Sequence, residues 1–185
     1  MAEYYFISQL PSLDGISDNS TIPITEQQFL ELCESFLGEK LLREVKNLTL
    51  VPQKYFDESS FELINKWNKA ERDLRFALAF TRAEKMNKLF DLKNIILTSD
   101  LLKVSSIAVN MDNPLEAENF LFKYRLAFLE TLRPMDVFSA DYILYYGLKL
   151  KLISKIRQFD FKVGEQAYKN IYDSILCGDR LGALL

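Results

Sequence analysis

Residues 60–88 run without a glycine or a proline, and this stretch restricts the possible folds more than any other part of the sequence. At 1.5 Å per residue it could form a helix about 40 Å long. A helix this apolar must be covered on more than one side. We therefore predict a long central helix that is the best covered of the chain. Its main apolar face carries Phe61, Ile64, Trp67, Leu74 and Leu78, and Phe76, Phe80 and Ala83 widen that face in the second half.

Three arginines, Arg72, Arg75 and Arg82, lie at spacings of three and seven in this run and form one narrow stripe. Guanidinium groups on a mostly apolar helix need carboxylates, carbonyls or a partner protein. One interpretation is a solvated face whose arginines pair with acidic neighbours on the same helix, each pair stabilising by only about 0.3–0.5 kcal/mol. The other is a partner-binding stripe or a buried network. The stripe is the candidate partner contact.

The composition predicts an all-α fold. The chain has 185 residues, of which 49% are hydrophobic and 13% aromatic, so it can bury a proper core. It contains only 6 glycines and 5 prolines, whereas sandwiches and barrels need many turns. We predict a multi-helix bundle of five to seven helices in a single domain, residues 1–185. Residues 1–24 form an N-terminal segment and loop, and residues 179–185 form a short tail.

Several helix boundaries carry recognisable signals. Thr25 followed by Gln28 is typical of a capping box at the start of a helix. Gly38 stands where a left-handed C-terminal cap belongs, and a second helix is expected from Glu39 to about Asn47. Asn113-Pro114 begins another helix, which ends before Pro134. Ser139 should cap the next helix, and a last helix is expected over residues 164–177, ending at Gly178.

Two segments stay open between helix and strand. Residues 4–7 are a short apolar run whose length cannot decide between a strand and a helical turn. Residues 89–112 are compatible with either structure, and the helical character of the rest of the chain favours helix.

Five tyrosines gather towards the C-terminus. Such a cluster is typical of core and rim packing, and a ligand pocket is the minority interpretation. The five are Tyr142, Tyr145, Tyr146, Tyr168 and Tyr172. The basic residues Lys149, Lys151, Lys155 and Arg157 lie towards the end of a helix, where its dipole favours positive charge.

The residue inventory excludes several kinds of site. The chain has no histidine, which excludes a Ser-His-Asp or Cys-His nucleophile and any histidine metal site. Neither GxxxxGK[ST] nor GxGxxG occurs. Cys33 and Cys177 are far apart and predict two lone thiols rather than a disulfide. We expect no catalysis, no cofactor and no metal, although a carboxylate pair would be unrecognisable from sequence.

Charge and hydropathy restrict the partners and the location. Residues 1–60 carry 10 acidic and 4 basic side chains, which argues against nucleic acid as a partner because phosphate binding needs a concentrated basic face. Glu3 stands where a signal peptide would carry a basic residue, and no apolar run reaches the ~18 residues of a spanning helix. We expect a soluble cytoplasmic protein.

Three segments together resemble a known family. They are Tyr4-Tyr5-Phe6-Ile7 followed by Leu10-Pro11, the segment Trp67–Lys85, and the tyrosine-rich C-terminal helix pair. Together they resemble a small bacterial family of uncharacterised proteins associated with V-type ATPase operons. That family is similar to a shortened form of the C-type (or d-type) subunit of V-type ATPases, an all-helical component of the central stalk.

The resemblance implies a non-catalytic adapter that contacts stalk subunits of a proton- or sodium-transporting rotary ATPase, at the cytoplasmic face of the membrane. No catalytic residue can be carried over from it. The larger family is roughly twice this length and is built from repeated helical subdomains, so this chain would lack part of its funnel-like shape. The alternative is a small helical ligand-binding domain or enzyme with a tyrosine-lined pocket. A regulatory homodimer with a two-fold contact along the long helix is a third interpretation. A deep cavity bearing tyrosines and carboxylates would favour the ligand-binding alternative, and an exposed apolar or arginine-lined face would favour the adapter.

Overall fold

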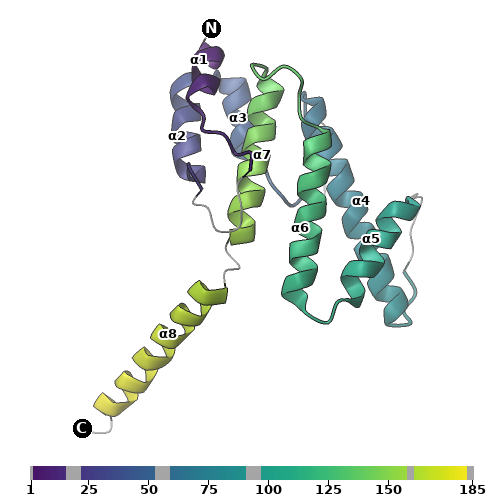
Figure 1. Ribbon diagram of the computed structural model, residues 1–185, viewed down its shortest axis with the longest axis vertical. Helices are drawn as coiled ribbons and strands as arrows, with labels where there is room; N and C mark the ends of the chain where they lie inside the picture. The colour runs from purple at the N-terminus through teal and green to yellow at the C-terminus, as the bar shows by residue number, and fades with distance from the viewer. Residues whose placement is uncertain (1, 16–21, 53–58, 91–96, 158–160, 183–185) are drawn as a thin grey trace.

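The chain folds into helices, as its composition predicts. The structure, a computed structural model, describes residues 2–15, 22–52, 59–90, 97–157 and 161–182. Within these ranges it contains eight α-helices and no strand (Figure 1). The all-α class is confirmed, and the count exceeds the predicted range by one because residues 4–7 belong to a helix. The helices are α1 (Ala2–Gln9), α2 (Glu26–Phe36), α3 (Glu39–Asn47), α4 (Glu62–Lys85), α5 (Ser99–Asn110), α6 (Pro114–Thr131), α7 (Ala140–Arg157) and α8 (Phe161–Gly182).

Helix α7 lies at the centre of the molecule. It packs against α2 and α3 on one side and against α4 and α6 on the other (Figure 1). Ten of its 18 residues are buried, against eight of 24 in α4. Gly147 permits the close packing, because a Cβ there would lie 2.9 Å from Leu48 Cδ1 and 3.2 Å from Phe29 Cε1. The best-covered helix is thus α7 rather than the long helix α4.

The buried apolar side chains form two clusters. The larger cluster joins α1, α2, α3 and α7 with the first half of α4 and parts of α6, and it includes Trp67, which is 2% exposed. The smaller cluster joins the second half of α4 to α5 and α6 through Leu74, Leu78, Ala108 and Leu121. Leu74 is 1% exposed, so the cover expected for the main apolar face of this helix is confirmed at Trp67 and Leu74. That the chain is one domain stays a prediction.

The predicted helix starts are largely confirmed. Thr25 and Gln28 form the capping box of α2, and the Asn113 side chain accepts a hydrogen bond from the backbone N–H of Leu115 at the start of α6. Ser139 Oγ accepts a hydrogen bond from the backbone N–H of Tyr142 (3.2 Å). The prediction for Gly38 is wrong: its φ is −69°, and it is the N-cap of α3. Leu37, the C-cap of α2, and Gly38 both have extended backbones, with ψ of 147° and 154°, so the chain leaves α2 without a left-handed turn and enters α3 directly.

Helix α4 ends slightly before the predicted Lys88. Asn87 has a positive φ of 53°, and the backbone N–H of Lys88 donates to the carbonyl oxygen of Ala83 (2.9 Å). This pattern is a Schellman-type C-terminal cap, in which asparagine can replace the usual glycine. The segment 89–112 contains helix α5, which supports the helical interpretation for residues 99–110. Residues 91–96 of this segment lie outside the described residues.

Helix α8 is longer than predicted and stands apart. It covers 161–182 rather than 164–177, and Gly178 does not end it. A glycine costs a helix interior only about 1 kcal/mol, so it does not by itself stop a helix. The first four residues of the predicted tail are therefore helical, and residues 183–185 lie outside the described residues. The helix extends away from the other seven (Figure 1) and makes no substantial contact with them in the described part of the chain.

Candidate functional site

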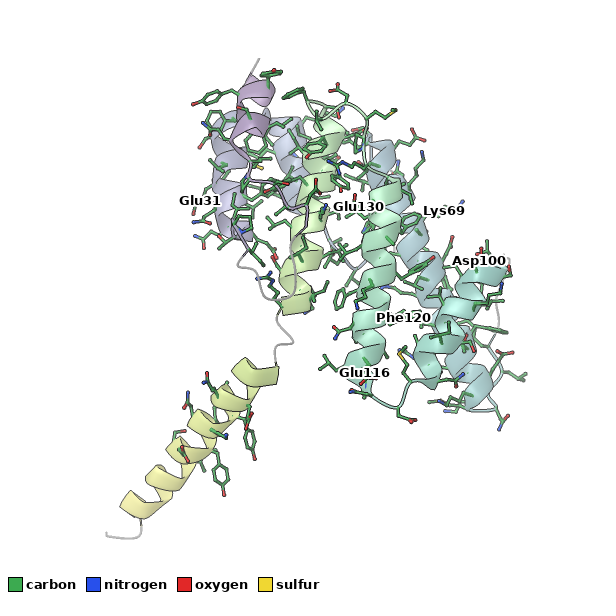
Figure 2. The ribbon with its side chains drawn as sticks, viewed as in Figure 1. Glu31, Lys69, Asp100, Glu116, Phe120 and Glu130 are labelled. Carbon is green, nitrogen blue, oxygen red and sulfur yellow. The ribbon has the colours of Figure 1, made fainter. Side chains whose placement is uncertain are left out.

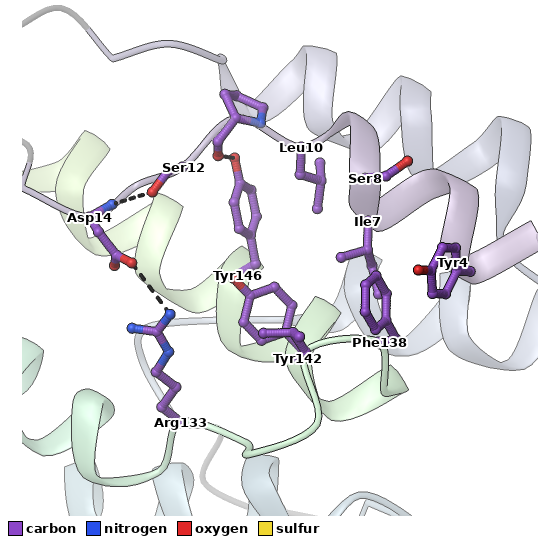
Figure 3. Close-up of a pocket in the computed structure, with 12 residues that line it drawn as sticks. Tyr4, Ile7, Ser8, Leu10, Ser12, Asp14, Arg133, Phe138, Tyr142 and Tyr146 are labelled. Carbon is purple, nitrogen blue, oxygen red and sulfur yellow. Dashed lines mark hydrogen bonds and ion pairs between the residues drawn. The ribbon is translucent and has the colours of Figure 1, made fainter.

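A pocket of about 360 Å³ lies where the N-terminal segment crosses the start of α7. Helix α1 and residues 10–14 form one wall, and the α6–α7 connection with the first two turns of α7 forms the other (Figure 3). The pocket is partly open to solvent. Its lining residues are Tyr4, Ile7, Ser8, Leu10, Pro11, Ser12, Asp14, Arg133, Val137, Phe138, Tyr142 and Tyr146.

Contacts between distant segments hold the pocket walls. The Tyr146 hydroxyl donates a hydrogen bond to the carbonyl oxygen of Pro11 (2.9 Å), which ties α7 to the chain after α1. The ring of Tyr4 stacks on that of Phe138 with centroids 4.0 Å apart. The Tyr142 hydroxyl makes no hydrogen bond within the described residues. The pocket therefore combines fixed walls with a tyrosine hydroxyl that is available to a ligand.

A charged cluster continues from one end of the pocket into the core. Lys149 is 7% exposed, and its Nζ lies 2.6 Å from Asp14 Oδ1 and 2.7 Å from Glu130 Oε1. The same Nζ donates to the Tyr145 hydroxyl at 3.3 Å. Arg133 Nη2 lies 3.3 Å from Asp14 Oδ2. Glu130 stands on α6 beside α7 (Figure 2), so this cluster joins α6, α7 and the N-terminal segment.

The cluster holds its two carboxylates and its ammonium group in their charged forms. A hydrogen bond from Lys149 lowers the pKa of Asp14. For Glu130 burial acts to raise the pKa, but hydrogen bonds from Lys149 and Tyr145 outweigh it and the pKa is lowered. For Lys149 burial acts to lower the pKa, but its hydrogen bonds to the two carboxylates and to Tyr145 outweigh it, so the pKa is raised. Burial raises the pKa of Tyr145 to about 12.

The arginine stripe divides into different environments. Arg75 Nε lies 2.9 Å from Glu71 Oε1, one turn earlier on α4. Arg72 and Arg82 are exposed and form no ion pair within the described residues. Arg75 therefore follows the pairing interpretation, whereas Arg72 and Arg82 remain available for the predicted partner contact.

The sequence pattern missed Arg125, which forms a more buried ion pair than any arginine of the stripe. Arg125 of α6 donates from Nε to Glu71 Oε2 (2.8 Å) and from Nη2 to Glu71 Oε1 (3.0 Å). The Glu71 side chain is 1% exposed and that of Arg125 is 12% exposed. This fork-shaped pair joins α4 to α6 across 54 positions of sequence. A single arginine among the apolar residues of α6 was the only signal in the sequence.

Sequence reasoning also missed the charged end of the pocket. It identified the tyrosines, and the structure places Tyr142 and Tyr146 in the pocket wall. It assigned Lys149 to the helix dipole, whereas the structure buries it between two carboxylates. The position of Lys149 between Leu148 and Leu150, both buried, was a signal that the lysine would need partners. Nothing in the sequence pointed to Asp14.

The remaining two tyrosines lie elsewhere. Tyr168 and Tyr172 stack on each other on α8, with centroids 6.1 Å apart. With Ile171 and Ile175 they form the apolar face of α8, and each of these four side chains is more than half exposed. In Figure 2 the side chains drawn on α8 stand clear of those of the other helices. We refer to these four residues as the α8 face.

The two cysteines differ in what the structure says of them. Cys33 is buried with a free thiol, and burial raises its pKa to about 12, so it is a poor nucleophile at neutral pH. The side chain of Cys177 lies outside the described residues. In the parts of the chain that the structure describes, no three or more acidic or cysteine side chains gather where they could hold a metal ion.

No protein-family model matches this chain, and no curated protein or solved structure matches it significantly. Among the described residues, no helix has both the length and the apolar character needed to cross a membrane.

Proposed function

We propose that this chain is a non-catalytic adapter that works through protein–protein contacts made by α8. The observation that carries the proposal is the α8 face. Tyr168, Ile171, Tyr172 and Ile175 are 67%, 61%, 52% and 59% exposed on one helix. Contiguous exposed apolar side chains on a folded protein are typical of an interaction site. An amphipathic helix that lays such a face into a groove is a common mode of recognition.

The charge of α8 favours a protein partner over a membrane surface. Helices that lie on membranes carry lysines and arginines on their polar face. In α8 the basic residues Lys162, Lys169 and Arg180 are balanced by Glu165, Asp173 and Asp179. Tyrosine is also enriched at protein interfaces, because its ring fills a pocket while its hydroxyl stays hydrated. The expected occupant is an apolar groove between helices of a partner protein.

The family resemblance supports a partner from the central stalk of a V-type ATPase, which would place the adapter in the cytoplasm at the face of a membrane complex. A stalk component transmits force through helices and needs no active site. The exposed Arg72 and Arg82 would supply a second, polar contact. An acidic N-terminal third and a mildly basic C-terminal third would steer the docking, so added salt should slow association.

The test is purification of tagged protein from its native host. Central-stalk subunits are expected to co-purify with the wild-type chain and to be lost with the double substitution Ile171→Ser and Ile175→Ser. Lys40→Gln, an exposed change on α3, is the matched control and should retain them. Recovery of the wild-type protein alone, with a bound metabolite, would overturn the adapter proposal.

The pocket favours a second candidate function, small-molecule binding. Its volume falls within the range of ligand sites, about 300–1,000 Å³, and it joins aromatic walls to a few polar groups, as such sites do. Ligand-observed NMR with a library of small polar and aromatic compounds tests this function. Binding that perturbs residues of α1 and the start of α7 would support it, and absence of any binding at millimolar concentration would exclude it.

A further inference from the structure

The pocket has two chemically different ends. Ile7, Leu10 and the stacked rings of Tyr4 and Phe138 form an apolar end (Figure 3). Tyr4 is 59% exposed and Phe138 39% exposed, so both rings offer surface that a ligand could cover. An apolar or aromatic group placed here would be removed from water, which is the main favourable term in binding such groups.

The opposite end presents a cation and an anion side by side. Arg133 Nη2 and Asp14 Oδ2 lie 3.3 Å apart, and both side chains are partly exposed, 40% and 53%. A guanidinium carries five N–H donors, and the contacts of Arg133 to Asp14 and to Glu130 leave others available. The free Tyr142 hydroxyl lies between this end and the apolar end (Figure 3).

The charge balance selects the kind of ligand. Asp14 and Glu130 are matched by Arg133 and Lys149, so the cluster is neutral as it stands. A ligand with only a carboxylate would compete with Asp14 for Arg133 and bring an excess negative charge to the cluster. A ligand with only an ammonium group would bring an excess positive charge. A ligand that carries both groups on neighbouring atoms adds no net charge and meets a partner for each.

We propose that this pocket binds a small zwitterion of the free amino-acid class, with its carboxylate on Arg133, its ammonium on Asp14 and an apolar or aromatic side chain between α1 and Phe138. The inference rests on the second candidate function, small-molecule binding, and does not involve α8. The Tyr142 hydroxyl donates a further hydrogen bond to the carboxylate.

The test is a calorimetric titration of the full chain with three matched compounds. L-phenylalanine carries both charged groups, 2-phenylethylamine lacks the carboxylate and 3-phenylpropionate lacks the ammonium. We expect L-phenylalanine to bind about tenfold or more tightly than either analogue, since each loses one hydrogen bond to a charged group. L-leucine should also bind, because the apolar end has no specific polar contact to an aromatic ring.

Substitutions locate the binding. Arg133→Gln should weaken L-phenylalanine binding about tenfold or more and should abolish its advantage over the amine. Tyr142→Phe keeps the ring and removes one hydrogen bond, so it should weaken binding by a smaller factor; it carries the test if Arg133→Gln does not fold. Arg43→Gln, an exposed change on α3 at a residue with no part in either proposed site, should leave the affinity unchanged.

Three results would overturn the proposal. Equal affinities for the three compounds would reject the zwitterion while leaving small-molecule binding in place. No binding of any compound at about 10 mM, with a folded protein, would reject the zwitterion proposal outright. If the Arg133→Gln and Tyr142→Phe variants both bind L-phenylalanine as tightly as the wild type, the ligand binds elsewhere.

Discussion

Glu71 and Arg125 are the pair of residues whose loss we expect to matter most for stability. Glu71→Ala leaves the 12%-exposed Arg125 without its carboxylate, and breaking a buried pair from one side costs about 3–5 kcal/mol. Urea unfolding should therefore show a large fall in the midpoint with little change in slope. Arg72→Ala and Arg82→Ala remove exposed side chains and should change the free energy of unfolding by less than about 0.5 kcal/mol. Equal changes in the free energy of unfolding for all three substitutions would show that the Glu71–Arg125 pair stabilises the fold no more than an exposed arginine does.

Lys149 should govern the acid sensitivity of the fold. The pKa values of Asp14 and Glu130 are lowered from 3.8 and 4.5, so the stability that they contribute is present above those values and is lost as the pH falls through the folded-state pKa values. In Lys149→Met the two carboxylates lose the largest of the contacts that lower their pKa values. The destabilisation by Lys149→Met should thus be largest near pH 7 and shrink towards pH 3. Urea midpoints at several pH values measure this difference, and a constant difference would contradict it.

At the scale of single helices, the C-terminal end of α4 depends on Asn87. Its φ of 53° is open to glycine and tolerated by asparagine, but it is strained for a β-branched residue. Asn87→Gly should be neutral or slightly stabilising, whereas Asn87→Val should cost about 1–2 kcal/mol. Thermal unfolding of the two variants checks the order. A Val variant as stable as the Gly variant would mean that α4 can end elsewhere.

Helices α7 and α8 contrast in what their apolar residues do. The apolar side chains of α7 are covered from several sides, whereas Tyr168, Ile171, Tyr172 and Ile175 on α8 are exposed. Ile175→Ala should therefore change the free energy of unfolding by less than about 0.5 kcal/mol, whereas Leu150→Ala should cost about 2–5 kcal/mol. Urea unfolding measures both variants. A large loss for Ile175→Ala would show that α8 packs on the body of the protein in solution.

For the molecule as a whole, the two hydrophobic clusters predict unequal local stability. Helix α5 is held by the smaller cluster, through Ala108 and its neighbours, whereas α7 is the centre of the larger one. Segments with few buried contacts open at lower free energy than the global unfolding reaction. Native-state hydrogen exchange should show the amides of α5 exchanging well before those of α7. Simultaneous exchange of both helices would show that the two clusters unfold as one unit.

Local chemistry was sufficient to predict the helices and several of their starts. The scarcity of glycine and proline, the capping box at Thr25 and the Asn113-Pro114 pair act within one turn of chain, so their effect can be read from neighbouring residues. Gly38 misled because a glycine just after a helix fits either a left-handed C-terminal cap or the N-cap of the next helix, and here it is the N-cap of α3. Residues 4–7 were undecided because a short apolar run fits a helix or a strand. In the structure these residues are helical, and the rings of Tyr4 and Tyr5 pack against Phe138 of the α6–α7 connection and Phe36 of α2.

The sequence by itself determined the all-helical class, the burial of Trp67 and Leu74, and the arginines and tyrosines worth following. Only the tertiary structure decided which charges meet. Asp14 reaches Lys149 across 135 positions and Glu71 reaches Arg125 across 54, and no local pattern records such pairings. The tertiary structure also decided that α7 is enclosed while α8 is exposed, since both helices carry apolar residues and only packing determines which of them is covered.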